Sequence, residues 1–175
     1  FVHGTKLLRF TMSSNIDLVI FGARGDLSKR KLFPALYHLD KAGLLADSVR
    51  IAGVAREDID SVIFIEQTRS ILEAAVGESE WDETVWKRFS HRLQYIRIDF
   101  SQKKQFGALK EWSIDKRTMV YYMATPPSIF GSICKHLDEA GCVGKTSRIV
   151  LEKPIGHDLE SSQEVNDTVG RYFPE

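Results

Sequence analysis

The chain has 175 residues, of which 43% are hydrophobic and 27% are charged, proportions that fit a folded globular protein and exclude a disordered one. Lysine plus arginine and aspartate plus glutamate both number 24, so the formal net charge is zero, which argues against a nucleic acid or a membrane as the partner. The two cysteines and five histidines show no metal-ligand spacing, so we expect no metal site and reduced thiols in a cytoplasmic protein.

Residues 1–11 have no clear hydrophobic period and precede Met12, which resembles a natural start of a protein. We expect residues 1–14 to be a vector-derived or disordered tail. A single domain is predicted over residues 15–175. The last predicted helix has little to stop it, and we expect the chain to be part of a longer protein.

Short apolar runs then alternate with amphipathic segments. In chain order we predict a strand at 18–21, a helix at 27–42 with Pro34 at a first-turn position or kink, a strand at 49–55, helices at 59–76 and 81–89, a strand at 93–98, a helix at 103–112, a strand at 119–123, a helix at 128–140, a strand at 148–151 and a helix at 159–172. This alternation predicts an α/β fold with a doubly wound, mostly parallel sheet and helices on both faces.

A glycine-containing turn joins the first predicted strand to the first helix. Its glycines, Gly22 and Gly25, are followed by Ser28, in place of the common Gly-x-Gly-x-x-Gly pattern. Glycines there let the backbone approach a pyrophosphate, and the N–H groups of the helix start face the anion. We predict a phosphate-binding turn, with an ordinary strand-to-helix turn as the alternative. Its residues are Gly22, Ala23, Arg24, Gly25, Asp26, Leu27, Ser28 and Lys29.

The second predicted strand ends at Arg56. Dinucleotide folds that prefer NAD place an acidic residue at this point, where it accepts a hydrogen bond from the ribose 2′-hydroxyl. Here the strand end offers no acid, and Arg56 stands across from Arg24 of the first turn. Two guanidiniums suit the oxygens of a 2′-phosphate. The pattern therefore favours NADP, with a solvated surface arginine as the alternative.

Two more segments follow predicted strands. Pro126 and Pro127 stiffen a loop in which we expect Ser128 to cap the next helix. Lys153 stands before Pro154, where we expect a cis peptide bond, and its ammonium group could hold a phosphate or a reacting hydroxyl. Both segments are predicted to line the cofactor crevice. A purely structural turn and a surface lysine are the alternatives.

In this order the four segments resemble the glucose-6-phosphate dehydrogenase family, in its N-terminal coenzyme domain. That family carries a Gly-Ala-Ser-Gly-Asp-Leu-Ala turn, a Gly-x-Ala-Arg strand end, a Pro-Pro loop and a Glu-Lys-Pro-x-Gly strand end. The resemblance covers residues 17–175 and implies a Rossmann-like, NADP-binding domain. It further implies oxidation of glucose 6-phosphate to 6-phosphogluconolactone with hydride transfer to NADP, the first step of the pentose phosphate pathway.

The resemblance also implies roles for individual residues. By motif match, residues 22–29 would hold the pyrophosphate and Arg56 the adenosine 2′-phosphate. Asp99 and Phe100, after the third predicted strand, would lie near the adenine or ribose. Lys153 would touch both the nicotinamide ribose and the sugar phosphate, with Pro154 in cis.

This chain departs from the family pattern at two positions. Arg24 replaces the usual serine of the turn, and Phe130 stands where some members have a tyrosine. The family's catalytic histidine, and the C-terminal α+β domain that carries its homodimer or homotetramer interface, are expected beyond residue 175. We therefore expect no catalytic residue here and no activity from this chain alone. A free-standing nucleotide-binding module without catalysis, and another NADP-dependent sugar oxidoreductase of the inositol type, remain alternatives.

Overall fold

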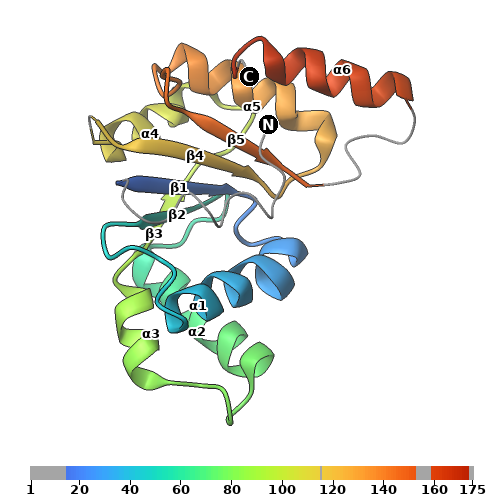
Figure 1. Ribbon diagram of the computed structural model, residues 1–175. Helices are drawn as coiled ribbons and strands as arrows, with labels where there is room; N and C mark the ends of the chain where they lie inside the picture. Colours follow the sequence, from blue (N-terminus) through green and yellow to red (C-terminus); the bar gives the residue numbers. More distant parts are fainter. Residues whose placement is uncertain (1–14, 115, 153–158, 174–175) are drawn as a thin grey trace.

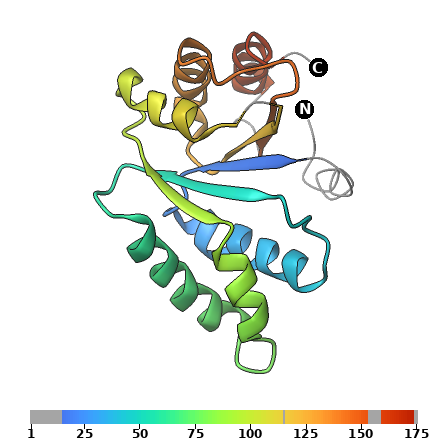
Figure 2. The same ribbon diagram turned by 90° about the vertical axis from the view of Figure 1, so that its left-hand side faces the viewer.

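The computed structural model describes residues 15–114, 116–152 and 159–173, and within them a parallel sheet lies between two layers of helices (Figures 1 and 2). The sheet has five strands in the order β3-β2-β1-β4-β5, and every neighbouring pair is parallel. The predicted doubly wound fold is confirmed. The strands are β1 (Ile16–Phe21), β2 (Arg50–Ala55), β3 (Leu93–Arg97), β4 (Thr118–Met123) and β5 (Arg148–Leu151).

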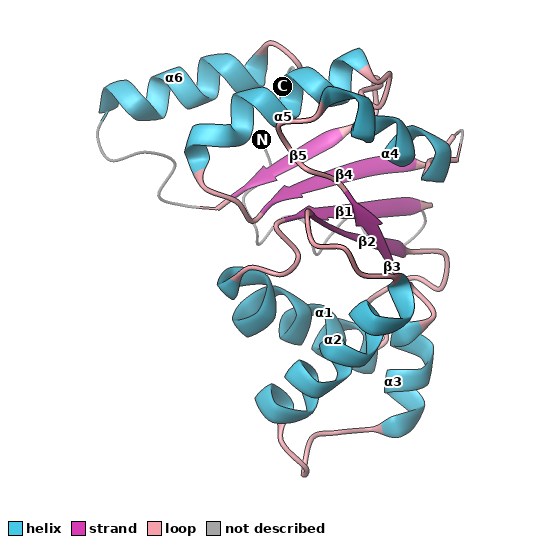
Figure 3. Ribbon diagram, turned by 180° about the vertical axis from the view of Figure 1, so that it is seen from behind, coloured by secondary structure: helices cyan, strands magenta, loops and turns pink. Residues whose placement is uncertain are grey.

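The helices divide evenly between the two faces of the sheet (Figure 3). One face carries α1 (Phe33–Lys41), α2 (Ser61–Val76) and α3 (Glu83–Ser90), and the other carries α4 (Gly107–Trp112), α5 (Phe130–Glu139) and α6 (Leu159–Gly170). None of the helices in the described ranges is long and apolar enough to cross a membrane.

The central strand β1 explains why both faces are covered. Its side chains alternate, so that Leu18 and Ile20 belong to the core under α1, α2 and α3, while Val19 and Phe21 belong to the core under α4, α5 and α6. A strand buried on both faces needs an almost unbroken apolar run. That run is the signal by which the sequence predicts β1.

The one charged side chain of β1, Asp17, is fully buried at the amino end of the sheet. Its Oδ1 accepts hydrogen bonds from Arg50 Nε at 2.8 Å and from Arg117 Nε at 2.6 Å. The guanidinium of Arg117 also donates to the backbone carbonyls of Ile16 and Ser48. A buried carboxylate with two cationic partners satisfies its charge, and here it ties β1 to the starts of β2 and β4.

The helix starts differ from the prediction in detail. The helix predicted from residue 27 opens with a π turn, Ser28–Leu32, in which the Phe33 N–H donates to Ser28 O, and α1 then begins with Pro34 in its first turn. Proline lacks the N–H that a regular helix would need, so the widened turn absorbs the missing bond. The helices predicted at 103 and 128 open with short 3₁₀ turns, Lys103–Phe106 and Pro127–Ile129.

The prediction that Ser128 caps the helix after β4 is wrong. Ser128 makes no capping hydrogen bond, because it lies inside the 3₁₀ turn and not before α5. Instead, aspartates cap the two helices after β2: Asp60 Oδ1 accepts from Ile63 N at 2.8 Å, and Asp82 Oδ1 accepts from Thr84 N at 2.8 Å. These caps start α2 and α3 two residues later than predicted.

Candidate functional site: the carboxyl edge of the sheet

The order of the strands reverses at β1, since β2 lies on one side of it and β4 on the other. Ligands of open α/β sheets bind at the carboxyl ends of the strands on either side of such a point. Gly22, directly after β1, approaches the loop after β4 so closely that an added Cβ would lie 2.5 Å from Ala124 O. Its backbone φ of +82° is also one that residues other than glycine rarely adopt. Gly22 is therefore required by its backbone conformation and by the close approach of the loop after β4.

Internal hydrogen bonds fix the turn that follows. Gly22 N–H donates to Val54 O at 3.0 Å, and Gly25 N–H donates to Gly22 O at 2.9 Å. The buried hydroxyl of Ser28 donates to the same carbonyl at 2.9 Å. Ala23 is also buried, 1% exposed. The side chains of Ser28 and Ala23 are therefore buried inside the turn and stabilise its shape.

The outer part of the turn has backbone N–H groups that remain free to bind a ligand. Among the described residues, no backbone carbonyl accepts a hydrogen bond from the amides of Arg24, Asp26 or Leu27. Lys29, at the start of the π turn, is half-buried, whereas the Asp26 carboxylate pairs at 2.9 Å with the exposed Arg30. Backbone amides at a helix start, together with basic side chains, form a site for an anion.

Arg24 supplies the sharpest indication of a ligand. Its Nε and Nη1 atoms are buried and have no hydrogen-bond partner among the described residues. The carboxylate of Glu57 lies 3.6 Å from Nε, within reach of an ion pair but too far for a hydrogen bond. Buried donors are nearly always satisfied, so this guanidinium fits an anionic group that arrives with the ligand. The residues present therefore fit a coenzyme that carries phosphates.

Arg56, Asp99 and Phe100 lie at the same edge. The Arg56 side chain is exposed, and in the described ranges no carboxylate lies within ion-pair distance of it. Asp99 Oδ1 accepts hydrogen bonds from the Ser101 hydroxyl at 2.7 Å and amide at 3.0 Å, and these bonds, with a smaller effect of the Arg56 charge, lower the pKa of Asp99. Phe100 packs edge-on against Phe21 with ring centroids 5.6 Å apart. Asp99 thus stays anionic near Arg56, and Phe100 belongs partly to the core.

At this edge the structure adds a detail at Thr125, in the loop predicted to line the crevice, and two residues that the sequence analysis missed, Tyr95 and Glu57. Thr125 Oγ1 is buried and without a partner among the described residues, and its methyl group would lie 3.0 Å from a Cβ on Gly22. Tyr95 OH donates to Glu57 O at 2.9 Å; burial raises the pKa of Tyr95, and the Glu57 charge adds to the effect. No local pattern signals Tyr95 or Glu57, because Tyr95 lies on β3 and Glu57 follows β2, and the pairing of these two strands brings them together.

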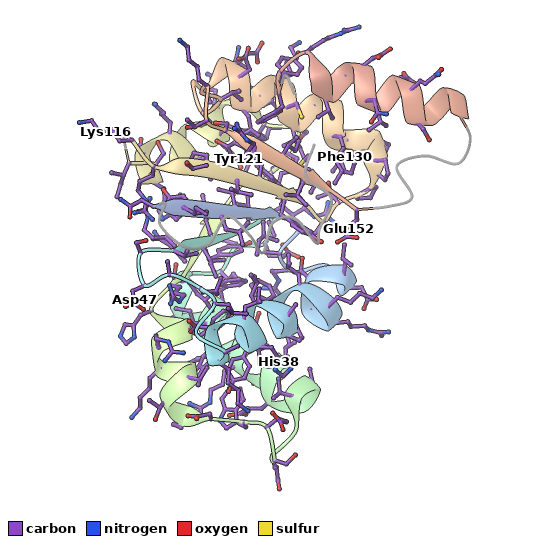
Figure 4. All side chains as sticks on the ribbon, viewed as in Figure 1. His38, Asp47, Lys116, Tyr121, Phe130 and Glu152 are labelled. Carbon is purple, nitrogen blue, oxygen red and sulfur yellow. The ribbon has the colours of Figure 1, made fainter. Side chains whose placement is uncertain are left out.

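The end of β5 also reaches this edge. Figure 4 shows Glu152 and Phe130 toward the right-hand edge of the sheet, and Asp47 and Lys116 toward the opposite edge. The Tyr122 hydroxyl, at the end of β4, donates to the Glu152 carboxylate, and burial, followed by that hydrogen bond, raises the pKa of Tyr122. Lys153 and Pro154, predicted to enter the crevice, lie outside the described residues.

Comparison with known proteins agrees with this geometry. The chain matches, over residues 19–175, the family described as glucose-6-phosphate dehydrogenase, NAD binding domain. It is 40% identical over 170 residues to a glucose-6-phosphate 1-dehydrogenase of Gluconobacter oxydans, covering 95% of this chain and 35% of the relative. With the enzyme of Dickeya dadantii it shares 41% identity over 160 residues, 91% of this chain and 32% of the relative.

Solved structures give the same picture. A crystal structure of glucose-6-phosphate 1-dehydrogenase from Mycobacterium avium superposes with a TM-score of 0.84 and 32% identity, covering 92% of this chain and 34% of that one. A glucose-6-phosphate dehydrogenase in complex with its substrate glucose 6-phosphate superposes with a TM-score of 0.80 and 29% identity, covering 94% of this chain and 35% of that one. This chain therefore spans about a third of the length of the relatives it matches.

Proposed function

The chain belongs to the glucose-6-phosphate dehydrogenase family, and on that premise we propose that it is the coenzyme-binding part of an enzyme that oxidises glucose 6-phosphate to 6-phosphogluconolactone. The proposed hydride acceptor is NADP. The single observation that carries the choice of site is the buried guanidinium of Arg24, with two donors unfilled beside the phosphate turn. A charged ligand group at that point would satisfy both donors.

The proposal gives each part of the edge a role. Within the turn over residues 22–29, the amides of Arg24, Asp26 and Leu27, free among the described residues, are proposed to hold the pyrophosphate, and Arg56 with Arg24 to hold the 2′-phosphate. Asp99 and Phe100 lie beside the adenosine, since β3 borders β2 on that side. Thr125, on the β4 side of the same crevice, offers its hydroxyl toward the middle of the coenzyme.

The chemistry at the sugar needs groups beyond these. When bound, the coenzyme supplies the hydride acceptor for C1 of the sugar. Lys153 is proposed to contact the nicotinamide ribose and the sugar phosphate. Its ammonium, protonated at neutral pH, is a poor base for the C1 hydroxyl. The base is proposed to be the family's histidine, in sequence that this chain does not contain, so the chain alone binds coenzyme without turning over.

The wider setting is proposed from the family. The partners are glucose 6-phosphate and NADP, the place is the cytoplasm, and the complete enzyme is a homodimer or homotetramer joined through its second domain. We also keep the boundaries of residues 1–14 as a tail and 15–175 as the NADP-binding domain as a proposal.

Calorimetric titration of the purified chain with NADP, and separately with NAD, tests the proposal. We expect measurable binding of both coenzymes and a lower Kd for NADP. Inorganic phosphate at the same ionic strength is the control, because a site that reads only charge would bind it in competition with either coenzyme. Absence of heat with both coenzymes at millimolar concentration would refute the assignment of the site.

A further inference from the structure

Glu57 is a carboxylate beside Arg24, one of the two arginines of the proposed 2′-phosphate site. It follows Arg56 at the end of β2, its side chain is 45% exposed, and its Oε1 lies 3.6 Å from Arg24 Nε. Within the described residues, Arg24 is its one ion-pair partner. The Arg24 guanidinium therefore pairs with Glu57 in the free chain, and it would pair with the 2′-phosphate in the proposed complex.

The backbone around Glu57 is held in place. Tyr95 OH donates to Glu57 O at 2.9 Å, and Arg97 Nε donates to Arg56 O at 3.3 Å. Arg97 Nη1 also pairs with Asp58 Oδ1 at 3.0 Å. Because these contacts come from the neighbouring strand β3, the loop cannot carry Glu57 far from Arg24 without breaking them. The backbone of Glu57 is therefore held beside Arg24, and its carboxylate remains within reach of that guanidinium.

Two charge effects follow from this placement. Glu57 offsets part of the positive charge of Arg24, and it repels a 2′-phosphate that carries close to two negative charges. A ribose 2′-hydroxyl meets neither penalty, since it can donate a hydrogen bond to a carboxylate. The site therefore combines two arginines suited to NADP with an acid suited to NAD, close to the strand end at which the sequence analysis expected no acid.

We propose that Glu57 determines coenzyme specificity by opposing the 2′-phosphate, so that this chain discriminates between NADP and NAD less than its two arginines would allow. The proposal rests on the coenzyme-binding function proposed above. It assigns Glu57 a direct part in reading the ribose, on the ground that its carboxylate faces the guanidinium that the phosphate needs.

The test is Glu57→Gln, with Asp58→Asn as the matched control. Both changes remove one negative charge from the same loop, but Asp58 pairs with Arg97 and not with Arg24. Dissociation constants are measured for NADP, NAD, 2′,5′-ADP and 5′-AMP by calorimetry. The two short nucleotides report on the adenosine end alone.

For Glu57→Gln we expect about two- to fivefold tighter binding of NADP and 2′,5′-ADP, the upper part of the range for a partly exposed charge pair. Binding of NAD and 5′-AMP should change by less than about twofold, since glutamine keeps an acceptor oxygen for the hydroxyl. In Asp58→Asn, the ratio of the Kd for NAD to the Kd for NADP should stay near that of the unmodified chain.

If the ratio of the Kd for NAD to the Kd for NADP were unchanged in Glu57→Gln, the proposal would be overturned. An equal gain in NADP affinity in Asp58→Asn would also overturn it, because it would indicate a long-range charge effect. Failure of the unmodified chain to bind either coenzyme is a different result, because it would refute the proposed function and remove the basis of this inference with it.

Discussion

Replacing Arg56 by alanine should weaken NADP binding and leave NAD binding nearly unchanged. The guanidinium is exposed and unpaired among the described residues, so the unmodified chain gives up no internal contact when it binds the phosphate. A hydrogen bond to a charged group contributes about 1.5–3 kcal/mol, which corresponds to a loss of roughly 10- to 150-fold at 1.4 kcal/mol per tenfold. Because water competes at an exposed site, we expect the lower end, about tenfold.

The assay is calorimetry with both coenzymes at low and at high salt. The loss of NADP affinity should shrink at 1 M salt, where the screening length falls to about 3 Å. Arg24→Ala should keep more of its effect, since two of its nitrogen atoms are buried. Arg69→Ala is the control, a partly exposed arginine of α2 that is already paired with Glu73 and Glu83, away from this edge. Equal losses for NADP and NAD in Arg56→Ala would refute the reasoning and make Arg56 a structural residue.

Four further outcomes are expected. The purified chain, given glucose 6-phosphate and NADP, should produce no NADPH above a buffer blank; steady production would mean that a base lies within it. Gly22→Ala should destabilise the fold by about 1–3 kcal/mol and abolish coenzyme binding, because a Cβ there would lie 2.5 Å from Ala124 O; an unchanged urea midpoint would contradict this. Asp17→Asn should cost about 3 kcal/mol by leaving the partly buried guanidinium groups of Arg50 and Arg117 without their fully buried counter-charge, which thermal unfolding would detect as a lower Tm. Burial raises the pKa of Cys134 to about 12 and of Cys142 to about 11, so at pH 8 both thiols should resist alkylation in the native chain and react after unfolding in urea; rapid native labelling would show that the core opens.

The strands were predictable because burial on both faces leaves a mark in the sequence. The predicted strand at 119–123 differs from β4 (Thr118–Met123) by one residue, since an apolar run between polar ends admits few alternatives. The helix starts were less predictable. Pro34 signals an irregularity near residue 30, but whether the chain bends or widens into a π turn depends on packing against the sheet.

The site was predictable where it is local. Gly22 and Gly25 stand out by spacing alone, and the structure places them at the turn after β1. The pairing of Arg24 with Glu57 could not be predicted, because it joins side chains 33 positions apart whose distance is set by the register of β1 against β2. An unpartnered hydroxyl such as that of Thr125 likewise becomes visible only in three dimensions.

The central place of β1 has a consequence for how the chain folds during synthesis. One edge of β1 pairs with β2, which follows soon after it, but the other edge pairs with β4, and the Arg117–Asp17 bond at that junction spans 100 positions. Until β4 leaves the ribosome, one edge of the largely apolar strand β1 has open N–H and C=O groups. An open edge of that kind invites pairing with another nascent chain. We therefore expect the interval between synthesis of β2 and synthesis of β4 to be the time at which this protein most depends on chaperones.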